Sequence, residues 1–181
     1  MIVIHPKDRT TSMLEQLYKN TPHQQIDTSL SKNQLRSLLY KEPAFKRIML
    51  LGHGCPDGLL TRDDDTKDNF RTLIDHSFSH ILKKHPGKIF ALFCHANLFA
   101  EKEHLHGLFS GMIISEMNEA KLYDIPTTEK ELDLENDKLA KRLKLLLDEG
   151  HPWCEIPQRI LQMDDAHTPL TEFNYHHFFY I

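Results

Sequence analysis

Two short apolar runs decide the fold of this chain: Ile48-Met49-Leu50-Leu51-Gly52-His53-Gly54 and Ile89-Phe90-Ala91-Leu92-Phe93-Cys94. Each has the length and composition of a buried β-strand, so we expect strands over residues 46–53 and 88–94. Between them, residues 70–82 carry apolar side chains at helical spacing and predict a helix. A strand–helix–strand unit makes the two strands parallel, so their carboxyl ends lie at one edge of the sheet. Open α/β sheets place their ligands at that edge.

The remaining pattern extends the same plan. A chain of 181 residues is long enough to bury a continuous core, and no repeat or flexible linker divides it. We therefore expect one α/β domain over residues 1–181, with three layers: a mainly parallel sheet and helices on both faces. Further elements are predicted as strands over residues 2–4 and 111–115, as helices starting after Ser31 and Thr128, and as a docked aromatic tail over residues 173–181.

Composition excludes several classes of function. Lysine and arginine number 22 against 26 acidic residues, a formal charge of −4, which argues against a nucleic-acid partner. No apolar run approaches the roughly 18 residues of a membrane-spanning helix, and the amino terminus lacks the pattern of a signal peptide. The three cysteines (Cys55, Cys94 and Cys154) do not form a disulfide framework. Free thiols fit a reducing interior, so we expect a cytoplasmic protein.

The predicted sheet edge brings together two residues with complementary chemistry, His53 and Cys94. A free cysteine is mostly protonated at neutral pH, and a neighbouring imidazole increases the thiolate fraction or accepts the proton during attack. We therefore assign Cys94 as a candidate nucleophile and His53 as the general base and then acid. Gly54 has no side chain, so its N–H is a candidate oxyanion donor. A lowered pKa of the Cys94 thiol is expected from this arrangement.

This arrangement resembles a known family. An apolar strand that ends in His53-Gly54, a helix-containing stretch and an apolar strand that ends in Cys94 look like the caspase–gingipain–separase clan of cysteine peptidases (clan CD), which includes bacterial CHAT-type domains. The turn at residues 57–60 and the stretch 107–114 are also similar to segments of those domains. The resemblance covers about residues 45–120. It implies a caspase-like fold and a Cys/His dyad that cleaves a peptide or protein substrate without a cofactor.

The resemblance also implies a specificity pocket, because members of the clan select substrates by a first pocket that is often charged. Ser115 and Glu116 follow the predicted strand 111–115, and they are the candidate substrate-binding residues. A carboxylate there implies a preference for basic residues. The other interpretation of Glu116 is a carboxylate that stabilises the start of a helix.

Two alternatives from other functional classes remain. In one, the caspase-like scaffold is a catalytically inactive interaction module, since a fold does not by itself imply an activity. In the other, His53, Cys55, Cys94 and His95 bind zinc, because all four are zinc-type ligands near one sheet edge. The spacing of a strong zinc motif is missing. The oligomeric state does not follow from the sequence.

Overall fold

The computed structural model describes residues 1–62 and 69–181. The main sheet contains β1 (Ile2–Ile4), β2 (Gln24–Gln25), β3 (Ile48–Leu51), β7 (Ile89–Leu92), β8 (Gly107–Ser110) and β9 (Phe178–Tyr180), and a small sheet contains β4 (Gly54–Cys55), β5 (Gly58–Thr61) and β6 (Arg71–Ile74). The helices are η1 (Ser12–Leu17), α1 (Lys32–Tyr40), η2 (His76–Phe78), α2 (Ser79–Leu82), α3 (Ala96–Glu103), α4 (Met117–Leu122), α5 (Glu129–Asp148), η3 (Trp153–Glu155), α6 (Ile156–Gln162) and α7 (Pro169–Tyr175), where η marks a 3₁₀ helix.

The main sheet has the strand order β2-β1-β3-β7-β8-β9. Its first five strands are parallel to one another, and β9 pairs antiparallel with β8. The α/β class and the mostly parallel sheet predicted from the sequence are therefore confirmed. The two apolar runs at residues 48–54 and 89–94 form adjacent strands, β3 and β7, near the middle of the sheet.

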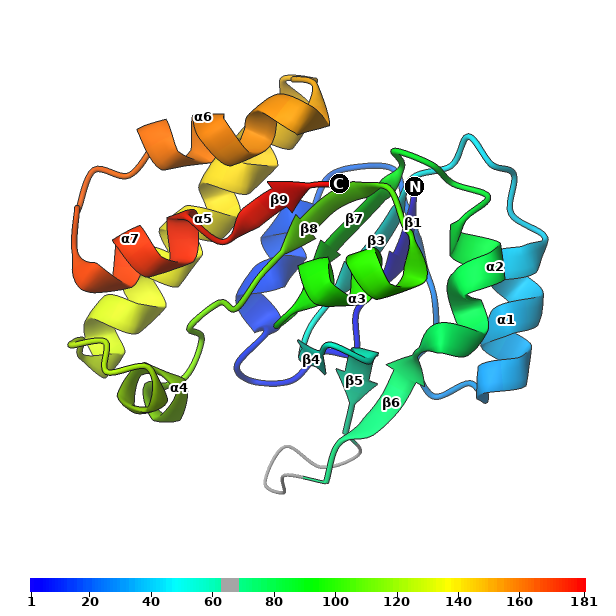
Figure 1. Ribbon diagram of the computed structural model, residues 1–181, viewed down its shortest axis with the longest axis horizontal. Coiled ribbons are helices and arrows are strands. Elements are labelled where there is room, and N and C mark those ends of the chain that lie inside the picture. Colours follow the sequence, from blue (N-terminus) through cyan, green and yellow to red (C-terminus); the bar gives the residue numbers. More distant parts are fainter. Residues whose placement is uncertain (63–68) are drawn as a thin grey trace.

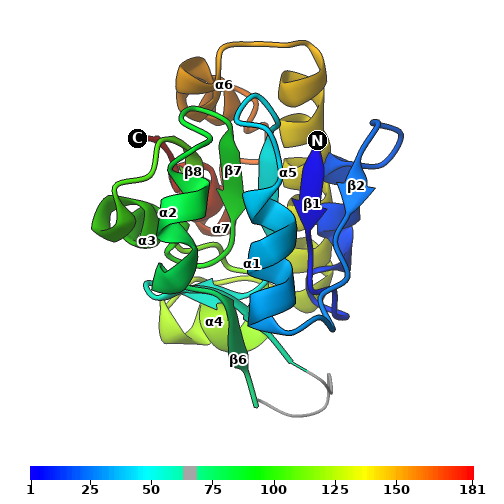
Figure 2. The same cartoon turned by 90° about the vertical axis from the view of Figure 1, so that its right-hand side faces the viewer.

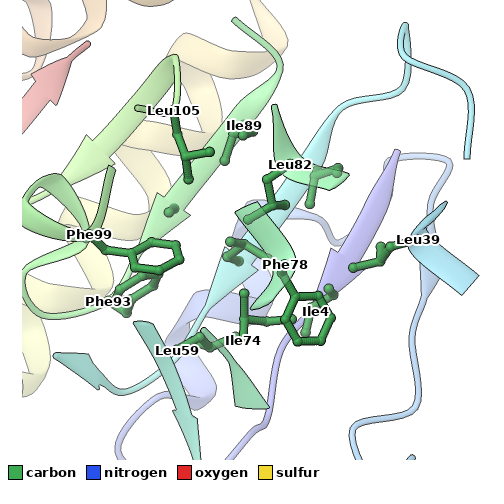
Figure 3. Packing of buried hydrophobic residues seen from close by; sticks show 14 of the residues in the cluster. Ile4, Leu39, Leu59, Ile74, Phe78, Leu82, Ile89, Phe93, Phe99 and Leu105 are labelled. Carbon is green, nitrogen blue, oxygen red and sulfur yellow. The ribbon is translucent and has the colours of Figure 1, made fainter. Parts of the chain in front are cut away.

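Side chains alternate between the two faces of the sheet, as the period of a β-strand requires. In β3, Ile48 and Leu50 pack in the core layer beneath α1, α2 and α3. Met49 and Leu51 pack in the opposite layer, which η1, α5 and α6 cover. Figures 1 and 2 show these helices on the two sides of the sheet, and Figure 3 shows part of the first core layer. Because both faces are covered, the central strands are apolar on both sides.

The helix predicted over residues 70–82 is wrong in its first half. Residues Arg71–Ile74 form strand β6, which pairs antiparallel with β5, and helical structure begins only after Asp75. The Asp75 carboxylate accepts a hydrogen bond from the Ser77 N–H, which caps the short helical segment. The apolar periodicity is real, since Leu73, Ile74 and Phe78 are all fully buried. Pairing with the preceding strand, β5, overrides that local pattern.

The strand predicted over residues 111–115 is also wrong. The sheet strand in this region is β8, and residues 111–115 continue beyond it without strand pairing. Met112 and Ile114 are buried, so the apolar side chains of this run serve core packing rather than strand formation. Its backbone is bound by side chains: Asn174 accepts from the Ile114 N–H at 2.8 Å, and Asn136 donates to the Ile114 carbonyl at 3.0 Å. Side-chain amides thus replace the sheet ladder at Ile114, whereas Gly111 still bonds to the backbone of His95 and His177.

The aromatic tail docks as predicted, and it does so as helix α7 and edge strand β9. Residues Gly58–Thr61 form β5, which pairs with β4 in a hairpin after β3. Figure 1 shows this small sheet and α4 at the lower end of the main sheet, where β3 and β7 end. Within the described ranges, no helix has the length and apolar character needed to cross a membrane.

Candidate functional site

The strand register places His53 and Cys94 at equivalent positions. Leu51, the last residue of β3, pairs with Leu92, the last residue of β7, and His53 and Cys94 each follow two residues later. The Gly52 N–H still donates to the Leu92 carbonyl at 3.1 Å, so the register continues past the formal strand ends. The positive φ of Gly52 (135°) ends the regular alternation before His53, so the surroundings of the two side chains are given by their own contacts. The predicted convergence on one sheet edge depends on this register.

His53 is held by residues of the loop that follows β1. Its Nε2 lies 2.8 Å from Asp8 Oδ2 and 2.9 Å from Thr10 Oγ1. The ring also packs at 5.0 Å, centroid to centroid, against Phe70. Since an ionised carboxylate can only accept, Nε2 carries the proton in this contact. In the neutral ring Nδ1 then has the free lone pair that a general base needs.

Asp8 is a buried carboxylate with an unusually complete set of donors. Its Oδ1 accepts from the backbone N–H groups and hydroxyls of Thr10 and Thr11, at 2.9–3.1 Å. Its Oδ2 accepts from His53 and, at 2.9 Å, from Arg62. Burial favours the protonated acid, but the bonds from His53 and Thr10 and the charge of Arg62 outweigh it and hold the pKa of Asp8 well below its usual range. Asp8 is thus a fixed negative charge behind the imidazole.

Cys94 is partly buried, and its thiol contacts the segment that leads into α4. Sγ lies 3.7 Å from the Ile113 carbonyl and 4.0 Å from Glu119 Oε1. Burial, together with the Glu119 carboxylate, raises the pKa of the Cys94 thiol to about 12. The lowered pKa of Cys94 expected from the sequence is therefore wrong for this conformation, because the thiol is buried and its charged neighbours are carboxylates. Among the described residues, no hydrogen bond joins Cys94 to His53.

Gly54 lies where a side chain would not fit. A Cβ at this position would overlap the Phe93 ring, which packs across it next to Cys94. Gly54 pairs with Leu59 in the small sheet. The proposed role of its N–H as an oxyanion donor stays a prediction. The structure supplies a packing reason for the glycine.

Glu116 lies beside His53 at the start of α4, and Ser115 precedes it in the chain. Glu116 Oε1 is 4.0 Å from His53 Nε2, although its backbone N–H donates to Glu119 Oε2 at 3.0 Å in the helix cap. Ser115 donates to the same Glu119 oxygen through its N–H, at 2.7 Å. Of the two predicted substrate-binding residues, Glu116 therefore adjoins the candidate base, and both take part in starting the helix.

A cavity of about 560 Å³ opens beside this point, between the loop after β1, η1, α4 and α5. Ser115, Glu116 and Thr10 are among its lining residues, so it borders the His53 network. The acidic lining side chains outnumber the cationic ones, Arg9 and Lys19. The carboxylates are those of Glu15, Glu116, Glu129, Asp133 and Asp137. Glu15 and Asp137 are ion-paired with Lys7 and Lys141, so much of the negative charge around the cavity is neutralised.

The predicted zinc ligands are not assembled. Within residues 1–62 and 69–181, no group of three or more His, Cys, Asp or Glu side chains has an arrangement that could hold a metal ion. His95 has a left-handed backbone (φ 64°) and caps α3, which breaks the strand that would have presented it beside Cys94.

Sequence reasoning missed Asp8, Thr10 and Glu119. Asp8 and Thr10 belong to a loop without a recognisable motif, and Glu119 is one acidic residue among many on a short helix. One signal could have found the first two, because an Asp-x-Thr-Thr run is typical of a turn in which the carboxylate binds the following N–H groups. Its place directly after β1, next to β3, would then have put it beside His53.

Comparisons with protein-family models, with curated proteins and with solved structures found no match for this chain.

Proposed function

We propose that this chain is a caspase-like cysteine hydrolase that cleaves peptide bonds, with Cys94 as nucleophile and His53 as general base. The observation that supports this proposal most directly is the register of β3 and β7. His53 and Cys94 each lie two positions beyond the paired strand ends, Leu51 and Leu92. The mostly parallel sheet with helices on both faces supports a caspase-like fold, as does the hairpin that follows His53-Gly54. In this proposal Asp8 positions the imidazole of His53.

In the proposed reaction, Nδ1 of His53 accepts the thiol proton as Cys94 Sγ attacks the substrate carbonyl carbon. The tetrahedral oxyanion collapses, the C–N bond breaks, and the imidazolium returns the proton to the leaving amine. Water then hydrolyses the thioester, with His53 again acting as the base. Asp8 stabilises the imidazolium and fixes the tautomer, and the Gly54 N–H is the proposed oxyanion donor. The reaction requires the thiol to turn from Ile113 toward His53.

The second candidate is a catalytically inactive module with the same scaffold. The contact of the Cys94 thiol with Ile113 and Glu119 favours it, because a protonated thiol directed away from the base does not attack a carbonyl. In that case the acid-lined cavity beside Glu116 is a binding surface without chemistry.

Peptide cleavage distinguishes the two candidates. The protein is incubated with a mixture of peptides of varied sequence, and products are identified by mass spectrometry. We expect cleavage by the wild type and by Cys154→Ser, whose cysteine is exposed and distant in sequence from the site. Cys94→Ala and His53→Ala should each abolish it. Cleavage that survives in Cys94→Ala, or none in any form of the protein, would contradict the proposed activity.

A further inference from the structure

The side of α1 that faces away from the core carries polar and cationic side chains. On the other side of the helix, Leu35 and Leu39 are fully buried in the core layer beneath it. Figures 1 and 2 show α2 beside α1 on the same side of the main sheet. The polar residues recur at intervals of three and four positions, as residues on one face of a helix do. They are Asn33, Arg36, Ser37, Tyr40 and Lys41.

Two hollows border this helix face. One, of about 430 Å³, lies between α1 and α2 and is also lined by His80. The other, of about 440 Å³, runs along α1 and is lined by Leu30 and Leu38. Ser37 and Lys41 line both, so the hollows adjoin one another. The helix face and the two hollows together are called the α1–α2 surface.

The α1–α2 surface has a positive charge that the protein does not neutralise. In the part of the chain that the structure describes, no carboxylate lines either hollow, and Arg36 and Lys41 have no ion-pair partner. Lys84, just after α2, lies over the Tyr40 ring at 3.4 Å from its centroid and adds a third cation. The whole chain has a formal charge of −4, so this concentration of cations is a local feature.

Unpaired cations on a concave surface attract an anionic partner. A guanidinium such as that of Arg36 binds a carboxylate through two parallel hydrogen bonds. Leu38, which is 37 % exposed beside these cations, favours a partner that also has apolar side chains to bury. A peptide with both acidic and apolar residues meets the two requirements. A nucleic acid would leave the leucines uncovered, and its long phosphate backbone would meet the negative charge of the remaining surface.

We propose that the α1–α2 surface binds an acidic segment of a partner protein. Carboxylates of the segment pair with Arg36 and Lys41, and its apolar side chains pack against Leu30 and Leu38. None of the residues of the candidate catalytic site belongs to this surface. The inference therefore goes beyond the proposed function and does not depend on it.

The test measures binding of synthetic fluorescein-labelled peptides of equal length to the full-length protein by fluorescence anisotropy. The first peptide contains Asp, Glu, Leu and Phe. The second has Asn and Gln in place of the acidic residues, and the third has Ser in place of Leu and Phe. We expect saturable binding of the first, no measurable binding of the second, and binding of the third that is weaker by about tenfold or more. Added salt should weaken binding of the first peptide, because it screens exposed charges.

Variants locate the binding surface. Arg36→Gln combined with Lys41→Gln should weaken binding of the first peptide by about tenfold or more, because both proposed partners of its carboxylates are lost. The matched control, Lys121→Gln combined with Lys130→Gln, removes the same charge from exposed lysines of α4 and α5 and should bind like the wild type. Ser37→Glu places a carboxylate where the hollows adjoin and should also weaken binding. Ser37 is exposed, so this variant serves if the double variant does not fold.

The inference is overturned by equal binding of the first two peptides, or by unchanged affinity in the folded double variant or in Ser37→Glu. A single-stranded oligonucleotide that binds more tightly than the first peptide, and that also requires Arg36 and Lys41, would identify a nucleic-acid site instead. The titrations are repeated with Cys94→Ala, which cannot cleave the peptides by the proposed reaction and should give the same affinities. Their outcome is therefore separate from that of the cleavage experiment.

Discussion

His53 is bound to Asp8 rather than to Cys94. The Nε2–Oδ2 distance is 2.8 Å, and both side chains are largely shielded from solvent, with 12 % and 3 % of their area exposed. The imidazole orientation is therefore set from the loop after β1, on the opposite side of β3 from β7. This relationship makes Asp8 the residue whose removal most directly tests how the site is organised.

Asp8→Asn should lower peptide cleavage by about 10²–10⁴-fold, the range by which general base catalysis accelerates reactions, while leaving the backbone turn in place. An asparagine can still accept from Thr10 and Thr11, but it does not hold the imidazolium. Stability should fall by about 1.5–3 kcal/mol, since charge-assisted bonds from His53 and Arg62 are lost. Cleavage rates and urea unfolding measure the two effects. A fully active Asp8→Asn would show that the imidazole is positioned by other groups.

The stability of the fold should depend on pH through His5. His5 is 2 % exposed, and burial, with the charge of Lys7, lowers the pKa of His5 from 6.5 to about 4. The neutral ring is favoured in the folded state, so its contribution is complete above pH 6.5 and is lost as the pH falls toward 4. At about 1.4 kcal/mol for each pKa unit, the loss amounts to about 3 kcal/mol.

Urea unfolding of the wild type between pH 7 and 4 checks this slope. His5→Leu should flatten the pH dependence, whereas His104→Asn, an exchange of an exposed histidine, should retain it. His104 has a positive φ of 50°, a conformation that asparagine tolerates, so this control is not strained. An identical slope in His5→Leu would assign the effect to other groups.

Gly54→Ala should disturb the end of β7. The added methyl group would overlap the Phe93 ring, and overpacking of this kind costs about 1–3 kcal/mol. Because Cys94 follows Phe93 directly, its alkylation rate should change as well. Phe93→Leu in the Gly54→Ala background should recover part of the lost stability in thermal unfolding. Full stability and unchanged alkylation in Gly54→Ala alone would refute the packing explanation for the glycine.

Asn174 and Asn136 should be coupled in stability. Asn174 Nδ2 donates to Asn136 Oδ1 at 3.0 Å, and both amides bind the Ile114 carbonyl. Asn174→Ala should cost about 1–3 kcal/mol, because a buried N–H of Ile114 loses its partner. The double variant with Asn136→Ala should lose less than the sum of the single losses, as expected for one network. Strict additivity in urea unfolding would show that the two residues act independently.

Much of the architecture could be predicted from local pattern. The apolar runs of β3 and β7, the Ser31 and Thr128 caps and the aromatic tail all correspond to elements of the structure. The two errors share a cause. Residues 70–82 and 111–115 have real apolar periodicity, but backbone groups in them are bound from outside a local helix or strand, by the β5 strand in the first case and at Ile114 by two asparagine side chains in the second. Periodicity reports burial and does not report which group satisfies the backbone.

The sequence by itself determined that His53 and Cys94 follow parallel strands, because two apolar runs with an intervening connection allow little else. Only the tertiary structure decided what each residue meets there. Asp8 reaches His53 because β1 lies beside β3, and Glu119 reaches Cys94 because the chain after β8 turns back into α4. The charge state of a side chain depends on such neighbours and on burial, which no local pattern encodes.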